Sequence, residues 1–167
     1  MCREFVYIML KPDTLEFKIR DIILKELVNV GGQLIASKTL ILNLDQISII
    51  YSEFPNERAK KAVFHYFTTR KTEHLIFMGE KGIHEKYQIA KGKTGTGIGI
   101  KGRHYTRYTK LTPIELEQWF EGTLTDIYDI DLEMFGRDIL HIPNSPDESR
   151  SSIQAIFSDS DLCRYQF

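Results

Sequence analysis

The sequence predicts an α+β fold in which helices cover a four-stranded antiparallel sheet. Short runs of apolar, aromatic and β-branched residues, typical of buried strands, alternate with longer segments whose apolar residues recur at helical spacings of three and four. The chain has 167 residues, of which 42% are hydrophobic, which is enough for one well-packed domain and too few for two ordinary ones. We therefore expect a single domain over residues 1–167.

The first strand and the first helix are indicated by residues 4–10 and 15–30. Residues 4–10 form an apolar run that stops at a Pro-Asp pair, as a buried strand does. The helix is predicted because its apolar residues share one face and because Gly31 and Gly32 supply a C-terminal stop. The residues of that face are Ile19, Ile22, Ile23 and Leu27.

Two more strands and three helices follow. Residues 33–42 predict a strand, after which Asn43 or Asp45 is placed to cap a short helix. Residues 56–70 and 81–90 predict two further helices, the second of them weaker, on either side of a strand over 74–79. The short helix carries Ile49, Ile50 and Tyr51, and the helix over 56–70 directs Ala59, Val63, Phe64 and Phe67 inward.

A fourth strand is predicted near residues 138–142, and the order of elements is that of a split β-α-β arrangement. Before it lie a glycine-rich stretch over residues 91–102 and a segment over 103–135. In that segment, Thr112 and Pro113 predict the start of a helix.

The glycine-rich stretch resembles two nucleotide-binding motifs, and neither fits. A Gly-x-Gly-x-x-Gly pattern runs from Gly97 to Gly102, but the dinucleotide motif needs a strand before it and a helix directly after it, and the residues that follow are a poor helix start. The Gly-Lys-Thr at 92–94 lacks the first glycine of a P-loop at the required spacing. The stretch still offers open backbone N–H groups beside Lys93 and Lys101, which suits a phosphate, whereas a flexible surface loop is the alternative.

Composition argues against several classes of partner. The 22 Lys and Arg residues are balanced by 23 Asp and Glu residues, so the net charge of -1 gives no broad attraction for nucleic acid or an anionic membrane. The first apolar run is too short for a membrane span or a signal peptide, which predicts a cytoplasmic protein. Cys2 and Cys163 lie apart from each other and from any histidine cluster, so neither a disulfide nor a zinc site is predicted.

His141 is the candidate for chemistry. It lies between two aliphatic residues, where the last strand-like run meets a Pro-Asn-Ser-Pro break. A lone histidine in such a place is more often a satisfied core residue than a reactive one. Its neighbours in sequence decide between the two interpretations.

Residues Lys11-Pro12-Asp13 after the first strand, the amphipathic helix and the Gly31-Gly32 stop resemble the opening of the nucleoside diphosphate kinase family. That family has an active-site histidine in the pattern Asn-x-x-His-Gly-Ser-Asp-Ser, followed by a helix that ends in Glu-Ile and an aromatic pair. The residues at corresponding spacings here are Asp138, His141, Asn144, Ser145, Ile153 and Phe157.

Three further motifs fall in family order. Tyr51, in the sequence IIYSEF, stands where the family has a tyrosine against the nucleotide phosphates. Thr94 stands where the family has a phosphate-binding threonine, and Lys101 stands where it has a phosphate-binding arginine. Together the motifs cover residues 4–102 and 137–157.

The resemblance implies a ferredoxin-like fold and a nucleoside diphosphate kinase, in which His141 accepts the γ-phosphate of a nucleoside triphosphate and passes it to a nucleoside diphosphate. It also implies Mg²⁺ bound with the nucleotide, no metal site of the protein's own, and a homo-oligomer, with a dimer as the more secure assembly. The residues expected to bind the substrate are Lys11, Tyr51, Thr94, Lys101 and Asp138.

The chain also departs from the family. Asp138 replaces an asparagine, Pro143 replaces a serine, and Ser152 replaces the glutamate that orients the imidazole. The segment over 103–135 is an insertion. These changes leave room for a reduced activity and for a second hypothesis, a nucleotide-binding regulatory module with weak or no kinase activity.

A third hypothesis concerns the insertion itself. Trp119, Phe120 and Tyr128 are suited to anchor a protein partner, although the core of a small added helix is the more common role of such a pattern.

Overall fold

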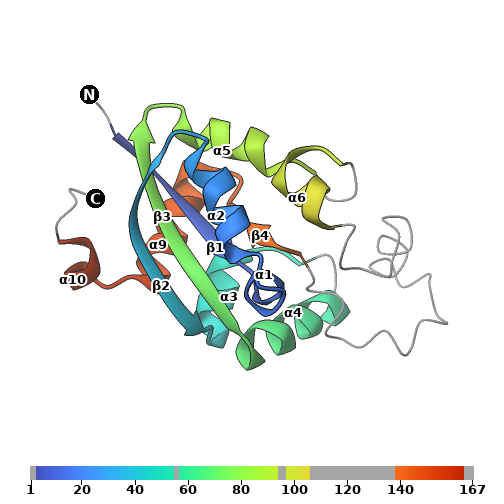
Figure 1. Ribbon diagram of the computed structural model, residues 1–167. Coiled ribbons are helices and arrows are strands. Elements are labelled where there is room, and N and C mark those ends of the chain that lie inside the picture. The colour runs from blue at the N-terminus through green and yellow to red at the C-terminus, as the bar shows by residue number, and fades with distance from the viewer. Residues whose placement is uncertain (1–2, 55–56, 94–96, 106–137, 164–167) are drawn as a thin grey trace.

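A computed structural model of the chain describes residues 3–54, 57–93, 97–105 and 138–163 (Figure 1). Its sheet has four strands in the order β2-β3-β1-β4, and each strand is antiparallel to its neighbours. The predicted fold class is therefore confirmed. The strands are β1 Arg3–Leu10, β2 Gln33–Ile41, β3 Lys71–Glu80 and β4 Leu140–His141.

Helices cover both faces of the sheet (Figure 1). Alternate residues of β1 point to opposite faces, so Ile8 joins the core under α2, α5 and α6, whereas Met9 joins the core under α3, α4 and α9. The helices are α1 Pro12–Glu16, α2 Arg20–Val28, α3 Leu44–Ile50, α4 Glu57–Thr69, α5 Ile83–Lys91, α6 Gly99–Tyr105, α9 Pro146–Ile156 and α10 Asp159–Leu162.

The single helix predicted over residues 15–30 is wrong in one respect, because the structure divides it into α1 and α2. Pro12 starts the first turn directly after β1, and Lys18 then adopts a left-handed backbone with φ of 56°. Within α2 the buried face is narrower than predicted. Ile23 and Leu27 are fully buried, but Ile22 is 52% exposed.

The other predicted elements agree with the structure to within a few residues, with one exception. Asn43, not Asp45, caps α3, and it forms a capping box with Gln46. The exception is the glycine-rich stretch, since residues predicted as loop from Gly99 onward form α6. Thr112 and Pro113, with the rest of residues 106–137, lie outside the described part of the chain.

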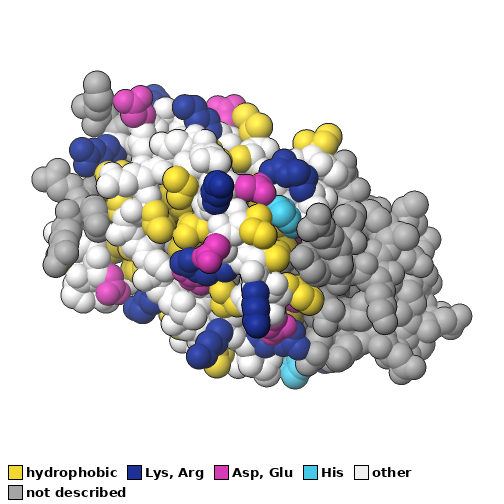
Figure 2. Space-filling view, in the orientation of Figure 1, with side chains coloured by type: hydrophobic (Ala, Val, Ile, Leu, Met, Phe, Trp, Pro, Cys, Tyr) yellow, Lys and Arg dark blue, Asp and Glu magenta, His cyan; other side chains and the backbone are white. Residues whose placement is uncertain are grey.

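Charges are mixed on the face of the molecule that Figure 2 shows. In the view of Figure 2, Lys and Arg side chains are interspersed with Asp and Glu side chains rather than gathered in one basic area. This distribution agrees with the near-neutral net charge of the sequence. Among the described residues, no helix is both long enough and apolar enough to cross a membrane.

A buried histidine, His74, lies within β3 and is fully satisfied by hydrogen bonds. Its Nδ1 is 2.6 Å from the hydroxyl of Tyr7, and its Nε2 is 2.7 Å from Oγ1 of Thr72. Burial, and secondarily the charge of Lys38, lowers the pKa of His74 to about 3. The ring is therefore neutral in the folded protein at physiological pH.

We expect His74 to make the protein less stable in acid. The ordinary pKa of histidine is about 6.5, so between that pH and about 3 the unfolded chain takes up a proton that folded His74 does not. The free energy of unfolding should consequently fall as pH drops below about 6.5, by up to about 1.4 kcal/mol per pH unit for this one group. Urea unfolding at a series of pH values measures the slope. His74→Gln cannot titrate, so a slope as steep as in the parent would contradict the assignment.

Candidate active site

The end of β1 and the short strand β4 bring Lys11 and His141 together. Met9 pairs with His141 across the two strands, and the backbone N–H of Lys11 donates to the carbonyl of Ile139 at 3.0 Å. The hydroxyl of Thr14, in α1, donates to the same carbonyl. Two residues predicted from distant parts of the sequence thus become neighbours.

Aromatic rings pack against His141. Its ring centroid lies 4.7 Å from that of Tyr51, and Tyr51 in turn stacks on Phe67 at 5.5 Å. Nζ of Lys11 lies 5.8 Å from the centroids of both Tyr51 and Phe67. Burial raises the pKa of Tyr51, so its hydroxyl keeps its proton and can act as a donor. That hydroxyl oxygen is buried and has no hydrogen-bond partner among the described residues.

The charges of three lysines from three parts of the chain act on His141. Burial, followed by the charges of Lys11, Lys101 and Lys91, holds the pKa of His141 well below its ordinary value. The imidazole is therefore neutral at physiological pH and surrounded by positive charge. A neutral imidazole is a nucleophile, and a group of ammonium ions attracts phosphate, so the arrangement suits transfer of a phosphoryl group.

Asp138 lies between two of these lysines. Its Oδ2 is 3.8 Å from Nζ of Lys11 and forms a closer ion pair with Lys101, and its Oδ1 accepts a hydrogen bond from the backbone N–H of Ile139 at 2.8 Å. The structure therefore brings together five of the six predicted site residues. They are Lys11, Tyr51, Lys101, Asp138 and His141.

The sixth predicted residue, Thr94, lies outside the described residues. The ends of its loop are described and are held close together by two glycines. Gly92 has φ of 67° and Gly99 has φ of 72°, and a Cβ built on Gly92 would lie only 2.1 Å from the carbonyl oxygen of Ile98. This contact sets where α6 begins, and α6 carries Lys101 to the site.

Lys91, at the end of α5, is a site residue that sequence reasoning missed. Its Nζ donates to the carbonyl oxygen of Ile142 at 3.1 Å, directly after His141. Burial, and then the charge of Lys101, lowers the pKa of Lys91 to about 8. In the sequence its only signal is a lysine in the last turn of a helix before the glycine-rich stretch. Such lysines commonly interact with the helix dipole.

We expect Lys91→Met to raise the pKa of His141, because the substitution removes one of the cations that disfavour the imidazolium. Titration of the His141 ring protons by NMR measures the change without any substrate. Lys86→Met, an exposed lysine on the same helix, is the matched control and should leave the titration as it is. A pKa of His141 that is unchanged or lower in Lys91→Met would contradict the electrostatic role.

The residues after His141 are held by α5. Nε2 of Gln88 donates to the carbonyl of Pro143, and Nζ of Lys91 donates to the carbonyl of Ile142. By contrast, Nε2 of His141 is buried without a hydrogen-bond partner among the described residues, and Ser152 is buried in α9. Among the described residues, no carboxylate contacts that nitrogen of the imidazole.

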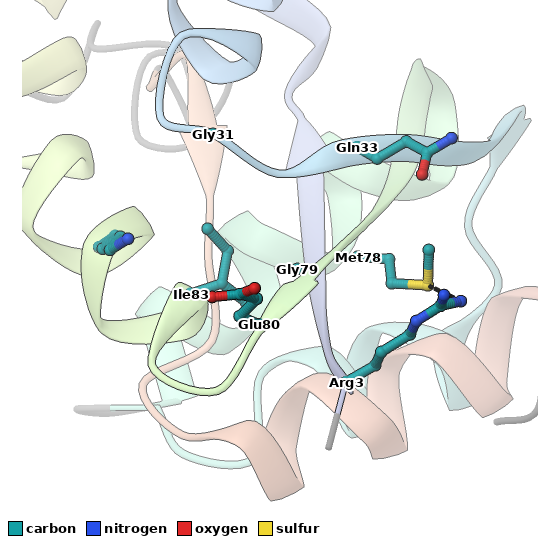
Figure 3. A pocket seen from close by; sticks show the side chains of 8 residues that line it. Arg3, Gly31, Gln33, Met78, Gly79, Glu80 and Ile83 are labelled. Atoms are coloured by element: carbon teal, nitrogen blue, oxygen red, sulfur yellow. Dashed lines mark hydrogen bonds between the residues drawn. The ribbon is translucent and has the colours of Figure 1, made fainter. Parts of the chain in front are cut away.

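A pocket lies away from this site, where β1 and β2 begin and β3 ends, beside α5 (Figure 3). Arg3, Gln33 and Glu80 are among the residues that line it, and Nη1 of Arg3 lies 3.6 Å from the sulfur of Met78. No predicted site residue lines it. In the described part of the chain, no group of three or more His, Cys, Asp or Glu side chains is arranged to hold a metal ion.

Two curated proteins resemble the chain over nearly its whole length. A nucleoside diphosphate kinase of Methanobrevibacter smithii is 22% identical over 160 residues, which cover 96% of this chain and 91% of that protein. A nucleoside diphosphate kinase of Methanosphaera stadtmanae is 23% identical over 164 residues, which cover 98% and 92%. No profile of a known protein family matches the sequence.

Solved structures share the fold. A nucleoside diphosphate kinase from Borrelia burgdorferi, described as a transition-state mimic with bound vanadate and ADP, aligns with a TM-score of 0.72 at 13% identity and covers 99% of this chain and 93% of its own. A nucleoside diphosphate kinase from Pyrobaculum aerophilum aligns with a TM-score of 0.67 at 15% identity, with coverage of 96% and 99%. At these identities the alignments bear on the fold alone.

Proposed function

Because this chain is a relative of the nucleoside diphosphate kinases, as its sequence motifs predicted, we propose that it is a phosphotransferase that moves the γ-phosphate of a nucleoside triphosphate to a nucleoside diphosphate through phospho-His141. The observation that carries the proposal is the environment of His141. A neutral imidazole lies in the field of three lysines and packs against Tyr51. The combination offers a nucleophile and a phosphate-binding surface in one place.

The transfer takes two steps in this proposal. A ring nitrogen of His141 attacks the γ-phosphorus, a P–N bond forms, and the bond from that phosphorus to the oxygen bridging to the β-phosphate breaks, so that the nucleoside diphosphate leaves with the electron pair. A β-phosphate oxygen of a second nucleoside diphosphate then attacks the same phosphorus, and the P–N bond breaks. The ring returns to its neutral form after each cycle.

The side chains around His141 divide the work of binding. Lys11, Lys101 and Lys91 balance the charge on the transferring and leaving oxygens, and the hydroxyl of Tyr51 donates a hydrogen bond to a phosphate oxygen. Thr94 is proposed as a second hydroxyl donor on the resemblance alone. Asp138 forms ion pairs with both Lys11 and Lys101.

Magnesium is proposed as a part of the substrate. Bound to the phosphates, Mg²⁺ supplies neutralising charge. The chemistry of the described site fits an ion carried in by the nucleotide, because lysines dominate it and the carboxylate of Asp138 is already engaged by two of them.

We also propose that the rate is reduced by the lack of an orienting carboxylate. In histidine enzymes such a partner fixes the tautomer and stabilises the imidazolium, and its loss can lower kcat by up to about 10⁴-fold. Here Nε2 of His141 has no partner in the described structure, and Ser152 stands where the family has its glutamate.

We expect the enzyme to act in the cytoplasm as a homo-oligomer, a dimer being the commonest closed assembly.

Trapping of the intermediate tests the function. The protein is incubated with Mg²⁺ and γ-labelled ATP, separated from nucleotide, and then mixed with an unlabelled nucleoside diphosphate. We expect acid-labile label on the protein that moves to the added diphosphate. Nucleotide binding without any label would instead favour the regulatory module, and no binding at all would rule out both.

A further inference from the structure

Asp138 forms ion pairs with the two lysines that would bind a phosphate group. Its Oδ2 pairs with both Lys11 and Lys101, and its Oδ1 is fixed by the backbone N–H of Ile139 at 2.8 Å. The side chains are enclosed, with exposed fractions of 12% for Lys11, 12% for Asp138 and 18% for Lys101. Partly buried charges of this kind are screened by salt much less than surface charges.

An ionised carboxylate cannot help to bind a phosphate directly. It has acceptor oxygens only, as a phosphate does, so the two groups compete for the same ammonium donors and repel each other. The polyphosphate must therefore draw Lys11 and Lys101 away from Asp138, or share them with it. The opposing energy grows with the negative charge of the incoming ligand.

We propose that Asp138 is a specificity-determining residue, an internal anion that weakens the binding of highly charged, metal-free polyphosphates and so favours nucleotides whose charge is already reduced by magnesium. The inference rests on the proposed function, because it concerns the same lysines. It reverses one expectation from the sequence, since Asp138 then restrains substrate binding instead of adding a contact to the substrate.

The test compares the affinities of the parent protein and Asp138→Asn for a ligand series. Isothermal titration is carried out with adenosine, AMP, ADP and ATP in EDTA, and with ATP in excess Mg²⁺. We expect Asp138→Asn to bind metal-free ATP about tenfold more tightly, the scale of one charge-assisted contact regained. The gain should shrink through ADP and AMP, vanish for adenosine, and be smaller for ATP with Mg²⁺ than for metal-free ATP.

Two further variants keep the result decisive. Asp147→Asn removes an exposed acid near the start of α9 and controls for net charge, so it should leave all affinities unchanged. Asp138→Ser serves in place of Asp138→Asn if the latter does not fold. A gain that is absent, equal in Asp147→Asn, or independent of ligand charge would overturn the proposal, as would weaker binding.

Inorganic tripolyphosphate separates this inference from the proposed function. If no nucleotide binds to either protein, the kinase proposal fails, and the same comparison is made with tripolyphosphate alone. Tighter binding of tripolyphosphate to Asp138→Asn would then still support the role of Asp138. Equal binding, or none to either protein, would overturn it.

Discussion

Replacing His141 by asparagine is expected to abolish the phosphoenzyme and to lower the exchange of phosphate between nucleotides by at least about a thousandfold, the scale seen when a catalytic nucleophile is removed. Asparagine keeps a planar polar group of similar size beside Tyr51, but its amide nitrogen is not a nucleophile. Nucleotide binding should survive, because the lysines remain. Label uptake from γ-labelled ATP and a coupled exchange assay measure the loss.

The control for this substitution is His65→Asn, which changes an exposed histidine on α4. It should label as the parent does. If His141→Asn took up acid-labile label at the parent's level, another residue would be the acceptor, and the role of His141 would be limited to packing against Tyr51.

Gly92→Ala is expected to destabilise the protein by about 3 kcal/mol or more and to remove Lys101 from the site. The backbone of Gly92, with φ of 67° and ψ of -168°, lies in a region that other residues adopt only at a cost of about 1–3 kcal/mol. The new methyl group would also meet the carbonyl oxygen of Ile98 at 2.1 Å and Cα of Gly99 at 2.6 Å. Because both contacts are to backbone, α6 must move to relieve them. Denaturant unfolding and nucleotide titration measure the two effects.

Gly82→Ala is the matched variant for that prediction. Gly82 also has a positive φ, of 90°, but a Cβ built there meets nothing within 4 Å, so only the backbone conformation opposes the change. Gly82→Ala should therefore be less destabilising and should leave nucleotide affinity unchanged. Equal losses of stability in the two variants would show that the contact between Gly92 and Gly99 does not matter.

Elements with strong local apolar patterns could be predicted from the sequence, whereas α6, which lacks such a pattern, could not. The apolar runs of β1 and β3 and the spacing of buried residues in α4 are local signals. They predicted β1 and α4 to within one residue at each end, and β3 without its first three residues. α6 has two glycines in seven residues and no such signal. It is held by the close packing of Gly99 on Gly92 and by burial of Ile100.

Some residues of the site could be predicted from local sequence motifs, and others could not. His141 and Lys101 were found because their motifs are contiguous in sequence. Lys91 was missed because its role depends on a bond to Ile142, a partner that the sequence places far away. The ion pairs of Asp138 likewise arise only once β1, α6 and β4 have met. A local sequence pattern does not predict contacts among three segments that are far apart in the chain.

The pairing of β4 with β1 also bears on how the protein folds. Among the described residues it pairs only Met9 with His141 and Leu10 with Leu140, and the adjoining hydrogen bond from Thr14 to Ile139 spans 125 positions. Such a closure costs much chain entropy for few contacts, so it follows the formation of the β2-β3-β1 sheet, whose strands are closer in sequence. If the strands form in that order, β1 has an open edge until β4 pairs with it, and an open edge is a template for pairing with a second chain. We therefore expect aggregation during refolding to increase with protein concentration, because the strand that carries His141 is the one that closes this edge.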